Sequence, residues 1–290
     1  MKKLLGRTHD YLSLIRFSHT IFAMPFALAG YFIGATRPGY GFTLKTFLLV
    51  LACMVFARSA AMGFNRWADM YFDSLNPRTA VREIPSGKIT PRQALLFGTA
   101  SSLLFILSAA LLNKLTFILS PVALIIVLGY SYTKRFTPLC HLVLGLGLSL
   151  APIGAYLAVT GSFALLPLLY SFIVLTWVSG FDIIYSLQDD QFDRDTGLYS
   201  IPAVMSRGKA LAISVVLHLI TAALVVVAGV YGQAGFIYWT GAAIFTGLLV
   251  FQHMIVRPDD LSRVNLAFGT TNGISGVIFG LAVVLDLLLL

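Results

Sequence analysis

Nine apolar segments, each long enough to cross a bilayer, constrain the fold of this chain more than any other feature. They cover residues 14–35, 44–65, 93–113, 115–132, 139–160, 163–187, 209–231, 234–255 and 267–290. Because lipid offers no hydrogen-bond partners to a peptide backbone, such segments cross the bilayer as helices. Only 11% of the residues are charged, against roughly 25% in soluble domains. We therefore predict an all-α fold, a polytopic membrane bundle of about nine transmembrane helices that forms a single domain over residues 1–290.

Basic residues are distributed unevenly between the two sides of this predicted bundle. If the N-terminus is cytoplasmic, all but four of the 20 Lys and Arg residues lie on the cytoplasmic side. The exceptions are Arg37, Lys45 and Lys114 on the opposite side and Arg58 within a span. Cytoplasmic loops of membrane proteins are enriched in Lys and Arg, so the bias predicts a cytoplasmic N-terminus. The net charge of +8 then reflects topology and contact with anionic lipid, and not binding to nucleic acid.

Two acidic blocks, each directly behind an apolar segment, predict a metal site on the cytoplasmic side. Asp69 and Asp73 lie in the stretch NRWADMYFD, and Asp189 and Asp193 lie in QDDQFD. A spacing of four residues places each pair on one face of a helix. Oxygen ligands without nearby His or Cys favour Mg²⁺, which usually also binds substrate phosphates. A solvated helix end is enough to explain one such block, but two in a chain with 12 acidic residues favour the metal site.

Basic residues in two loops on the same side predict a diphosphate site beside the metal. Arg78 and Arg82 lie in a loop whose Pro and Gly residues favour turns that fold it back over the first acidic block. Lys134 and Arg135 follow the fourth span. Guanidinium groups suit phosphate oxygens because they offer paired N–H donors. Membrane topology alone explains any single one of these cations. Together with the acids, above an apolar bundle, they indicate a diphosphate with an apolar tail.

Two ionisable residues within spans predict a polar pocket below the metal site. Arg58 lies two helical turns before Asn65 on the same face, and Asp182 has the same relation to Asp189. Charges inside a bilayer are costly and usually face a cavity or a partner. The two residues therefore either line a pocket or form a structural ion pair with each other, and the sequence favours neither alternative.

The last span carries further polar and small residues. Asn265 and Asn272 lie two turns apart and are candidates for lining the same pocket. The small residues of this span fit close helix packing better than ligand contact. They are Gly269, Gly273, Gly276 and Gly280.

Two stretches resemble the paired signatures of the UbiA superfamily of intramembrane prenyltransferases. The first is NRWADMYFD followed by NPRTAVREIPSG, and the second is YSLQDDQFDRDTGLYSIPA. The run RSAA at 58–61 resembles the branch that acts on 4-hydroxybenzoate, including the related enzymes of the futalosine route to menaquinone. The resemblance extends over residues 16–272, which is nearly the whole chain.

The chain departs from the signatures at two places. Arg66 stands where many members have Asp. Asp190 offers a second register for the second signature, and the four-residue step leads us to choose Asp189 and Asp193.

The resemblance implies Mg²⁺-dependent transfer of a polyprenyl group from a polyprenyl diphosphate to a small aromatic acceptor similar to 4-hydroxybenzoate, in ubiquinone or menaquinone biosynthesis. It also implies a bacterial cytoplasmic (inner) membrane protein whose active site faces the cytoplasm. The predicted metal ligands are Asp69, Asp73, Asp189, Asp193 and Asn65, and the predicted catalytic residues are the same four Asp and Lys134. The predicted diphosphate-binding residues are Asn65, Arg78, Arg82, Lys134 and Arg135. The predicted acceptor-binding residues are Arg58, Asp182, Asn272 and Arg16.

Other functions fit parts of this pattern. Members of the same superfamily that prenylate naphthoate, haem or chlorophyll precursors remain alternatives. A transporter fits nine apolar spans with buried charges, but the acids cluster on one side and do not form a path across the membrane. Alcohol phosphotransferases also carry Asp-rich motifs at the membrane edge, but their motifs differ from those found here. The sequence leaves the acceptor, the prenyl length and the oligomeric state open.

Overall fold

The structure is a computed structural model that describes residues 11, 13, 14 and 23–289. The predicted N-terminal tail and Arg16, expected at the acceptor site, lie outside the described residues. Every regular element of the described part is helical. These elements are α2 (Met24–Ala35), α3 (Leu44–Ala68), α4 (Met70–Leu75), α5 (Pro91–Ala110), α6 (Lys114–Thr133), α7 (Cys140–Thr160), α8 (Leu165–Ser186), η2 (Leu187–Asp189), α9 (Asp190–Asp195), α10 (Ile201–Val204), α11 (Arg207–Tyr231), α12 (Phe236–Ile255), η3 (Leu266–Thr271) and α13 (Asn272–Leu289).

Eight of the described helices are long and apolar enough to cross a membrane. They agree with the second to ninth predicted segments to within a few residues, except that the helical stretch of the sixth continues through η2 and α9 to Asp195. The last one begins with η3, a π-helical turn. The described part of the first predicted segment is α2, a shorter apolar helix of 12 residues. The prediction of an all-α membrane bundle is therefore confirmed.

Local sequence explains why the paired helices α5 and α6 begin where they do. Thr90 and Gln93 form a capping box at the start of α5, with Pro91 in the first turn. Asn113 and Thr116 form the same arrangement at the start of α6. Each box satisfies backbone N–H groups that have no partner inside the helix. The helix starts are thus set by short-range signals within the sequence.

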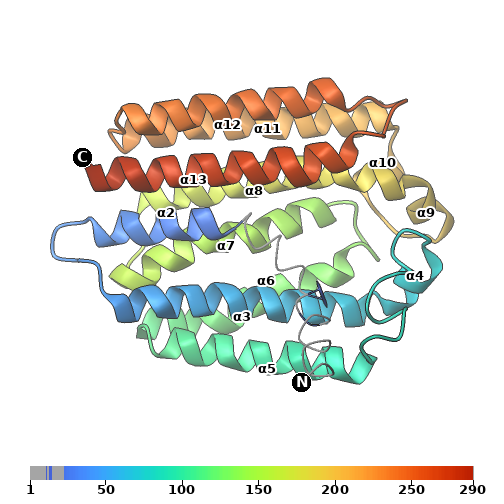
Figure 1. Cartoon of the computed structure of the whole chain (residues 1–290), viewed down its shortest axis with the longest axis horizontal. Helices are drawn as coiled ribbons and strands as arrows, with labels where there is room; N and C mark the ends of the chain where they lie inside the picture. The colour runs from blue at the N-terminus through green and yellow to red at the C-terminus, as the bar shows by residue number, and fades with distance from the viewer. Residues whose placement is uncertain (1–10, 12, 15–22, 290) are drawn as a thin grey trace, which may run out of the picture.

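The long helices run side by side, so the loops gather at two ends of the bundle (Figure 1). Helix α3 packs on α5 and α6, α7 packs on α2 and α8, α8 packs on α11, and α12 packs on α13. The short helices α4, α9 and α10 lie together at one end, and the loop between α2 and α3 lies at the other (Figure 1). Both acidic blocks therefore reach the same end.

Aromatic side chains fill the centre of the bundle around α8. Trp177 is fully buried, and its ring lies 5.3 Å from that of Phe26 and 5.5 Å from that of Phe245, measured between centroids. These rings come from three helices, α8, α2 and α12, so their contacts fix the helices relative to one another.

Two glycines of the last span allow the close packing that the sequence predicted. A Cβ atom at Gly276 would lie 2.7 Å from the ring of Trp177, and one at Gly280 would lie 2.2 Å from the side chain of Pro25. The prediction is wrong for Gly269, where a Cβ atom would meet open space.

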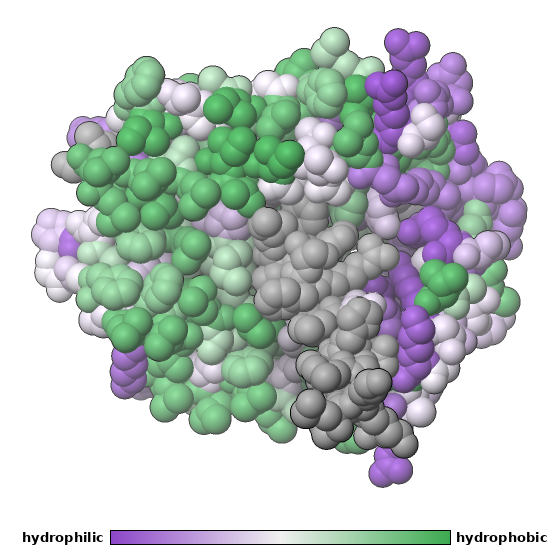
Figure 2. Space-filling view, viewed as in Figure 1, coloured by the Kyte–Doolittle hydropathy of each residue, from purple (hydrophilic) through white to green (hydrophobic). Residues whose placement is uncertain are grey.

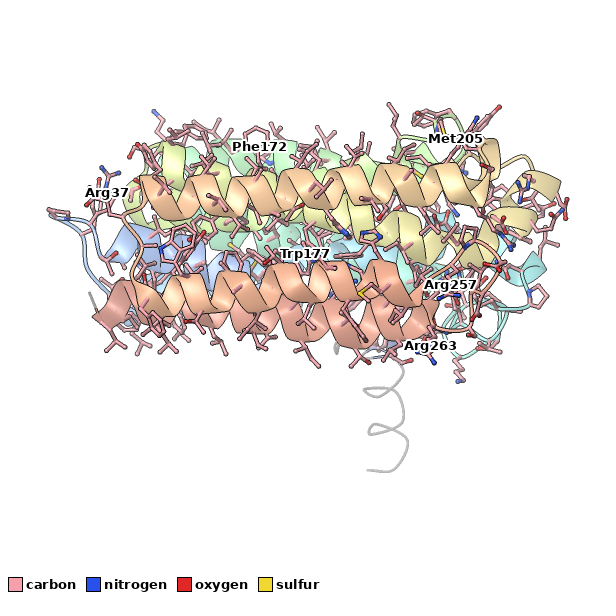
Figure 3. The ribbon with its side chains drawn as sticks, turned by 90° about the horizontal axis from the view of Figure 1, so that it is seen from above. Arg37, Phe172, Trp177, Met205, Arg257 and Arg263 are labelled. Carbon is pink, nitrogen blue, oxygen red and sulfur yellow. The ribbon has the colours of Figure 1, made fainter. Side chains whose placement is uncertain are left out.

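The surface separates into an apolar belt and a hydrophilic end. Hydrophobic residues cover the sides of the long helices, and hydrophilic residues gather at the end that carries α4, α9 and α10 (Figure 2). Leu96, Leu103 and Leu107 on α5 are exposed, as expected for a helix face in contact with lipid. Arg257 and Arg263 lie at the hydrophilic end, and Arg37 lies at the opposite end (Figure 3). This distribution agrees with the bias of basic residues along the sequence.

Candidate active site

Both acidic blocks continue a membrane helix past its end. Helix α3 ends at Ala68, α4 begins directly after Asp69, and the N–H of Asp73 donates to the carbonyl of Asp69 at 2.8 Å, so Asp73 lies one turn beyond Asp69. In the second block, the 3-10 turn η2 ends at Asp189 and α9 carries Asp193. Each pair is thereby held at the hydrophilic end by the helix that precedes it.

The four carboxylates face one cavity of about 210 Å³ at the hydrophilic end, which we call the charged cavity. It brings together all the residues that the sequence predicted for metal and diphosphate. The lining includes Asn65, Asp69, Asp73, Arg78, Arg82, Lys134, Arg135, Asp182, Asp189 and Asp193. Sequence segments as distant as the two acidic blocks therefore meet at a single site.

Every one of these four carboxylates lies beside a basic side chain. The Oδ1 of Asp73 lies 2.6 Å from an Nη of Arg82, and Asp189 pairs with Arg78. The remaining two pairs are Lys134 with Asp193, at 2.8 Å, and Arg135 with Asp69, at 3.7 Å. The loop that carries Arg78 and Arg82 folds back over both acidic blocks. The turn residues of this loop predicted that it would fold back over the first block.

The charges of these pairs alter the acidity of the groups involved. Burial disfavours the charged form of Lys134, but Asp193 outweighs this and the pKa of Lys134 is raised. Burial, and then the charge of Asp73, raise the pKa of Asp69 to about 6, although the neighbouring Arg135 acts in the other direction. The charged form of Asp69 is therefore disfavoured beside Asp73. A cation added between the two carboxylates would stabilise the charged form of both.

The donor set suits a divalent cation, although the ligands are not yet gathered around one point. Asp73 Oδ2 is buried, and it has no hydrogen-bond partner in the described part of the chain. Within that same part, no three His, Cys, Asp or Glu side chains lie close enough together to hold a metal ion. The ion pairs explain this arrangement because each carboxylate is turned toward a base. The residues present therefore fit Mg²⁺, provided that the bases release the carboxylates.

Asp190 is turned away from the charged cavity. Its side chain is 2% exposed and accepts hydrogen bonds from Arg207, at 2.8 and 2.9 Å, and from Arg194, at 2.6 Å. Arg207 also donates to the carbonyl of Pro258. Asp189 and Asp193, the two acids of the register that we chose for the second signature, thus face the charged cavity, whereas Asp190 does not.

A second cavity of about 400 Å³, the apolar cavity, extends between α3, α5, α6 and α7. Tyr130 and Leu144 line both cavities, so the two meet at these residues. Arg58 also lines the apolar cavity, and the remaining lining is almost entirely apolar. Along α6 the lining runs from Thr116 to Tyr130, a helix rise of about 21 Å. A diphosphate in the charged cavity can therefore place a long apolar tail in the apolar cavity.

The predicted acceptor residues separate in the structure. Asp182 lines the charged cavity, and its Oδ2 lies 2.7 Å from Nδ1 of His141. Asn272 is fully buried and bonds to Trp177 and Gln252, so its placement at the acceptor site is corrected: its polar atoms serve helix packing. Asn265 is exposed, and it too lines neither cavity.

Arg66, the departure from the first signature, is buried and lies 3.8 Å from Glu83 of the loop that covers the site. It therefore helps to hold that loop against α3.

Several residues of the site were not predicted from the sequence, among them Asn76, Tyr185 and Ser200. Asn76 donates a hydrogen bond to Asp189 at 3.0 Å. Tyr185 accepts one from Arg78 at 2.9 Å. Ser200 donates to Asp193 at 2.8 Å. Tyr185 and Ser200 lie at the two ends of the second signature, which is the signal that could have identified them.

A family model described as the UbiA prenyltransferase family matches residues 23–277. The chain belongs to this family. Among curated UbiA relatives, a 4-hydroxybenzoate octaprenyltransferase of Nitrosospira multiformis is 32% identical over 248 residues, which is 84% of each chain. One of Nitrosomonas europaea is 32% identical and covers 81% of this chain and 80% of the relative. These similarities show that the UbiA protein described here is a prenyltransferase.

Solved structures of UbiA homologues share the fold. The apo structure of a UbiA homologue from Aeropyrum pernix K1 has a TM-score of 0.83 and 36% identity, covering 92% of this chain and 98% of that one. A UbiA homologue from Archaeoglobus fulgidus, bound to DMAPP and Mg²⁺, has a TM-score of 0.73 and 22% identity, covering 97% and 100%.

Proposed function

We propose that this prenyltransferase transfers a polyprenyl group from a polyprenyl diphosphate to a small aromatic acceptor similar to 4-hydroxybenzoate, with Mg²⁺, in quinone biosynthesis. The observation that carries the proposal is the meeting of the charged cavity and the apolar cavity at Tyr130 and Leu144. This arrangement matches a substrate with a diphosphate head and an apolar tail. The names of the curated relatives support the choice of acceptor.

In this proposal, acids and bases of the charged cavity exchange partners when the substrate binds. Asp69, Asp73, Asp189 and Asp193, with Asn65, would hold Mg²⁺, as the oxygen donors of the site suit that ion. Mg²⁺ would supply positive charge against the diphosphate that departs, and the Archaeoglobus fulgidus homologue binds this metal. The bases released from the carboxylates would donate to the diphosphate oxygens. They are Arg78, Arg82, Lys134 and Arg135.

The apolar cavity would protect the reactive carbon. When the bond between the allylic carbon and the diphosphate breaks, its electron pair leaves with the diphosphate and the carbon becomes cationic. The apolar walls would exclude water from this carbon, so that the aromatic ring attacks it instead. Loss of a ring proton then restores aromaticity. Arg58, at the wall of the apolar cavity, would bind the acceptor carboxylate through its guanidinium group.

Assays on membranes test this function directly. Membranes that contain the protein would be incubated with labelled polyprenyl diphosphates of several lengths and a panel of aromatic acids, including 4-hydroxybenzoate and a hydroxynaphthoate. We expect prenylation of the hydroxybenzoate, no product in EDTA, and recovery on adding Mg²⁺. Full turnover in EDTA would contradict the metal assignment. Preference for the naphthoate would instead change the acceptor.

We also propose that the charged cavity faces the cytoplasm of a bacterial inner membrane, because that end of the bundle carries most of the basic residues. Ser86→Cys and Thr196→Cys should label only from the cytoplasmic side, and Gly41→Cys only from outside. The variants would be made after replacing Cys53 and Cys140, the two free native cysteines. Labelling of positions 86 and 196 from opposite sides would refute the single site.

A further inference from the structure

His141 and Asp182 form a hydrogen-bonded pair inside the charged cavity, close to its meeting with the apolar cavity. His141 is the second residue of α7, one turn before Leu144, which lines both cavities. Its Nδ1 lies 2.7 Å from Oδ2 of Asp182, which comes from α8. Both residues line the charged cavity but carry none of the ion pairs with its Arg and Lys side chains described above. The roles assigned to metal and diphosphate therefore leave this pair unused.

The surroundings of His141 determine which ring nitrogen carries the proton. The backbone N–H of Ile201 donates to Nε2 of His141 at 3.3 Å. A nitrogen that accepts a hydrogen bond has no proton of its own, so the neutral ring carries its proton on Nδ1. His141 therefore donates to Asp182.

The two members of the pair differ in exposure. The side chain of His141 is 1% exposed, whereas that of Asp182 is 20% exposed. Because Asp182 lines the charged cavity, its exposed part is available to a molecule bound there. The pair is thus arranged with His141 as the fixed, buried member and Asp182 as the member that can reach a ligand.

The segment at Ser200 and Ile201, which contacts His141 through Ile201, also holds an acid of the proposed metal site. Ser200, next to Ile201, donates to Oδ2 of Asp193 at 2.8 Å. On its other side, the hydroxyl of Ser179 donates to the carbonyl of Leu175 at 2.6 Å and also lies 3.2 Å from the carbonyl of His141. The position of His141 is therefore tied to that of Asp193, so the Asp182 carboxylate has a defined place relative to the diphosphate.

We propose that His141 is a positioning residue for the acceptor: it holds Asp182 so that the carboxylate accepts a hydrogen bond from the hydroxyl group of a phenolic acceptor. This inference rests on the proposed function. A phenol whose hydroxyl bonds to an anion has a more electron-rich ring, which favours attack by the carbon beside the hydroxyl. With Arg58 at the wall of the apolar cavity, the acceptor class would be an aromatic acid with a free hydroxyl.

Two substitutions of His141 separate positioning from general destabilisation. His141→Leu removes the donor, whereas His141→Asn retains an N–H near the place of Nδ1. With hydroxybenzoate as the acceptor, we expect His141→Leu to raise the acceptor KM roughly 10- to 100-fold, the range for losing a hydrogen bond to a charged group. The KM of the polyprenyl diphosphate should change less than about twofold, and His141→Asn should recover most of the loss. Equal changes in both KM values for both variants would refute the inference.

Benzoate, which lacks the hydroxyl, supplies a readout that a structural role would not produce. As a competitive inhibitor of the hydroxybenzoate reaction, it should have the same Ki in the unsubstituted protein and in His141→Leu. Weaker inhibition of the variant by benzoate would refute the proposed hydrogen bond and indicate a general distortion of the site. If the unsubstituted protein prenylates no phenolic acid, the proposed function fails. If it does so, and His141→Leu leaves the acceptor KM unchanged, only the role of His141 fails.

Discussion

Adjacent carboxylates in the second acidic block should respond oppositely to the same substitution. Asp189 faces the charged cavity, whereas Asp190 is held by Arg207 and Arg194 outside it. Asp189→Asn removes a proposed charged Mg²⁺ ligand but keeps the shape of the side chain. Arg78, which then loses its ion pair, is 29% exposed and keeps its bond to Tyr185. We therefore expect a folded protein whose kcat/KM falls by at least about 100-fold, as for the loss of one stabilising group at a developing anion.

Asp190→Asn should affect stability and leave the chemistry in place. The carboxylate accepts three hydrogen bonds from arginines, each worth on the order of 1.5–3 kcal/mol when charged. Arg207 and Arg194 are 38% and 41% exposed, so water replaces much of the lost interaction. We expect a net loss of about 2 kcal/mol, which corresponds to a fall in Tm of roughly 4–8 °C. Activity at low temperature should retain its Mg²⁺ dependence.

The assay measures prenyl transfer against Mg²⁺ concentration at low temperature, together with thermal unfolding in detergent, for both variants and the unsubstituted protein. The decisive comparison is between activity and Tm. If Asp190→Asn loses activity as severely as Asp189→Asn while its Tm is unchanged, Asp190 is a ligand and the assigned register is wrong.

Three further substitutions test the rest of the site. Arg58→Met should raise the acceptor KM strongly, by the equivalent of about 2–5 kcal/mol for a buried charge that loses its partner; an unchanged acceptor KM in a folded protein would remove Arg58 from the site. Lys134→Met should lower kcat by about 100-fold, because a cation at the diphosphate is lost; retention of kcat would show that Lys134 serves only to pair with Asp193. Gly154→Phe should shift turnover toward shorter prenyl diphosphates, because Gly154 lines the apolar cavity and a Cβ there meets open space. The control is Gly247→Phe, at an exposed position outside both cavities. An equal shift in prenyl-length preference in both variants would count against a prenyl tail in the apolar cavity.

Some features of the site follow from the sequence because they depend on residues close together in the chain. Hydropathy identified the long helices, and the four-residue spacing of Asp69 and Asp73 placed both carboxylates toward the charged cavity. The turn residues after the first acidic block predicted that the loop folds back, and Arg82 does contact Asp73 at 2.6 Å. In each case the physical cause acts over a few residues: helix period, backbone satisfaction in lipid, or turn geometry.

Other features were decided only by the tertiary structure. Arg78 pairs with Asp189, 111 positions away, and nothing local in either segment specifies that contact. The spacing that made Asn272 a candidate ligand is also compatible with the interior of a helix bundle, where packing placed it against Trp177 and Gln252.

The sequence by itself thus determined the class of protein, the helices, the end of the bundle that carries the acids and the family. Tertiary structure decided which base neutralises which acid, that Asp190 is turned away from the site, and that the charged cavity and the apolar cavity meet at Tyr130 and Leu144. The physical reason is the range of the forces involved. Hydropathy, helix period and capping are written along the chain, whereas a cavity and its ion pairs exist only once separate helices pack together.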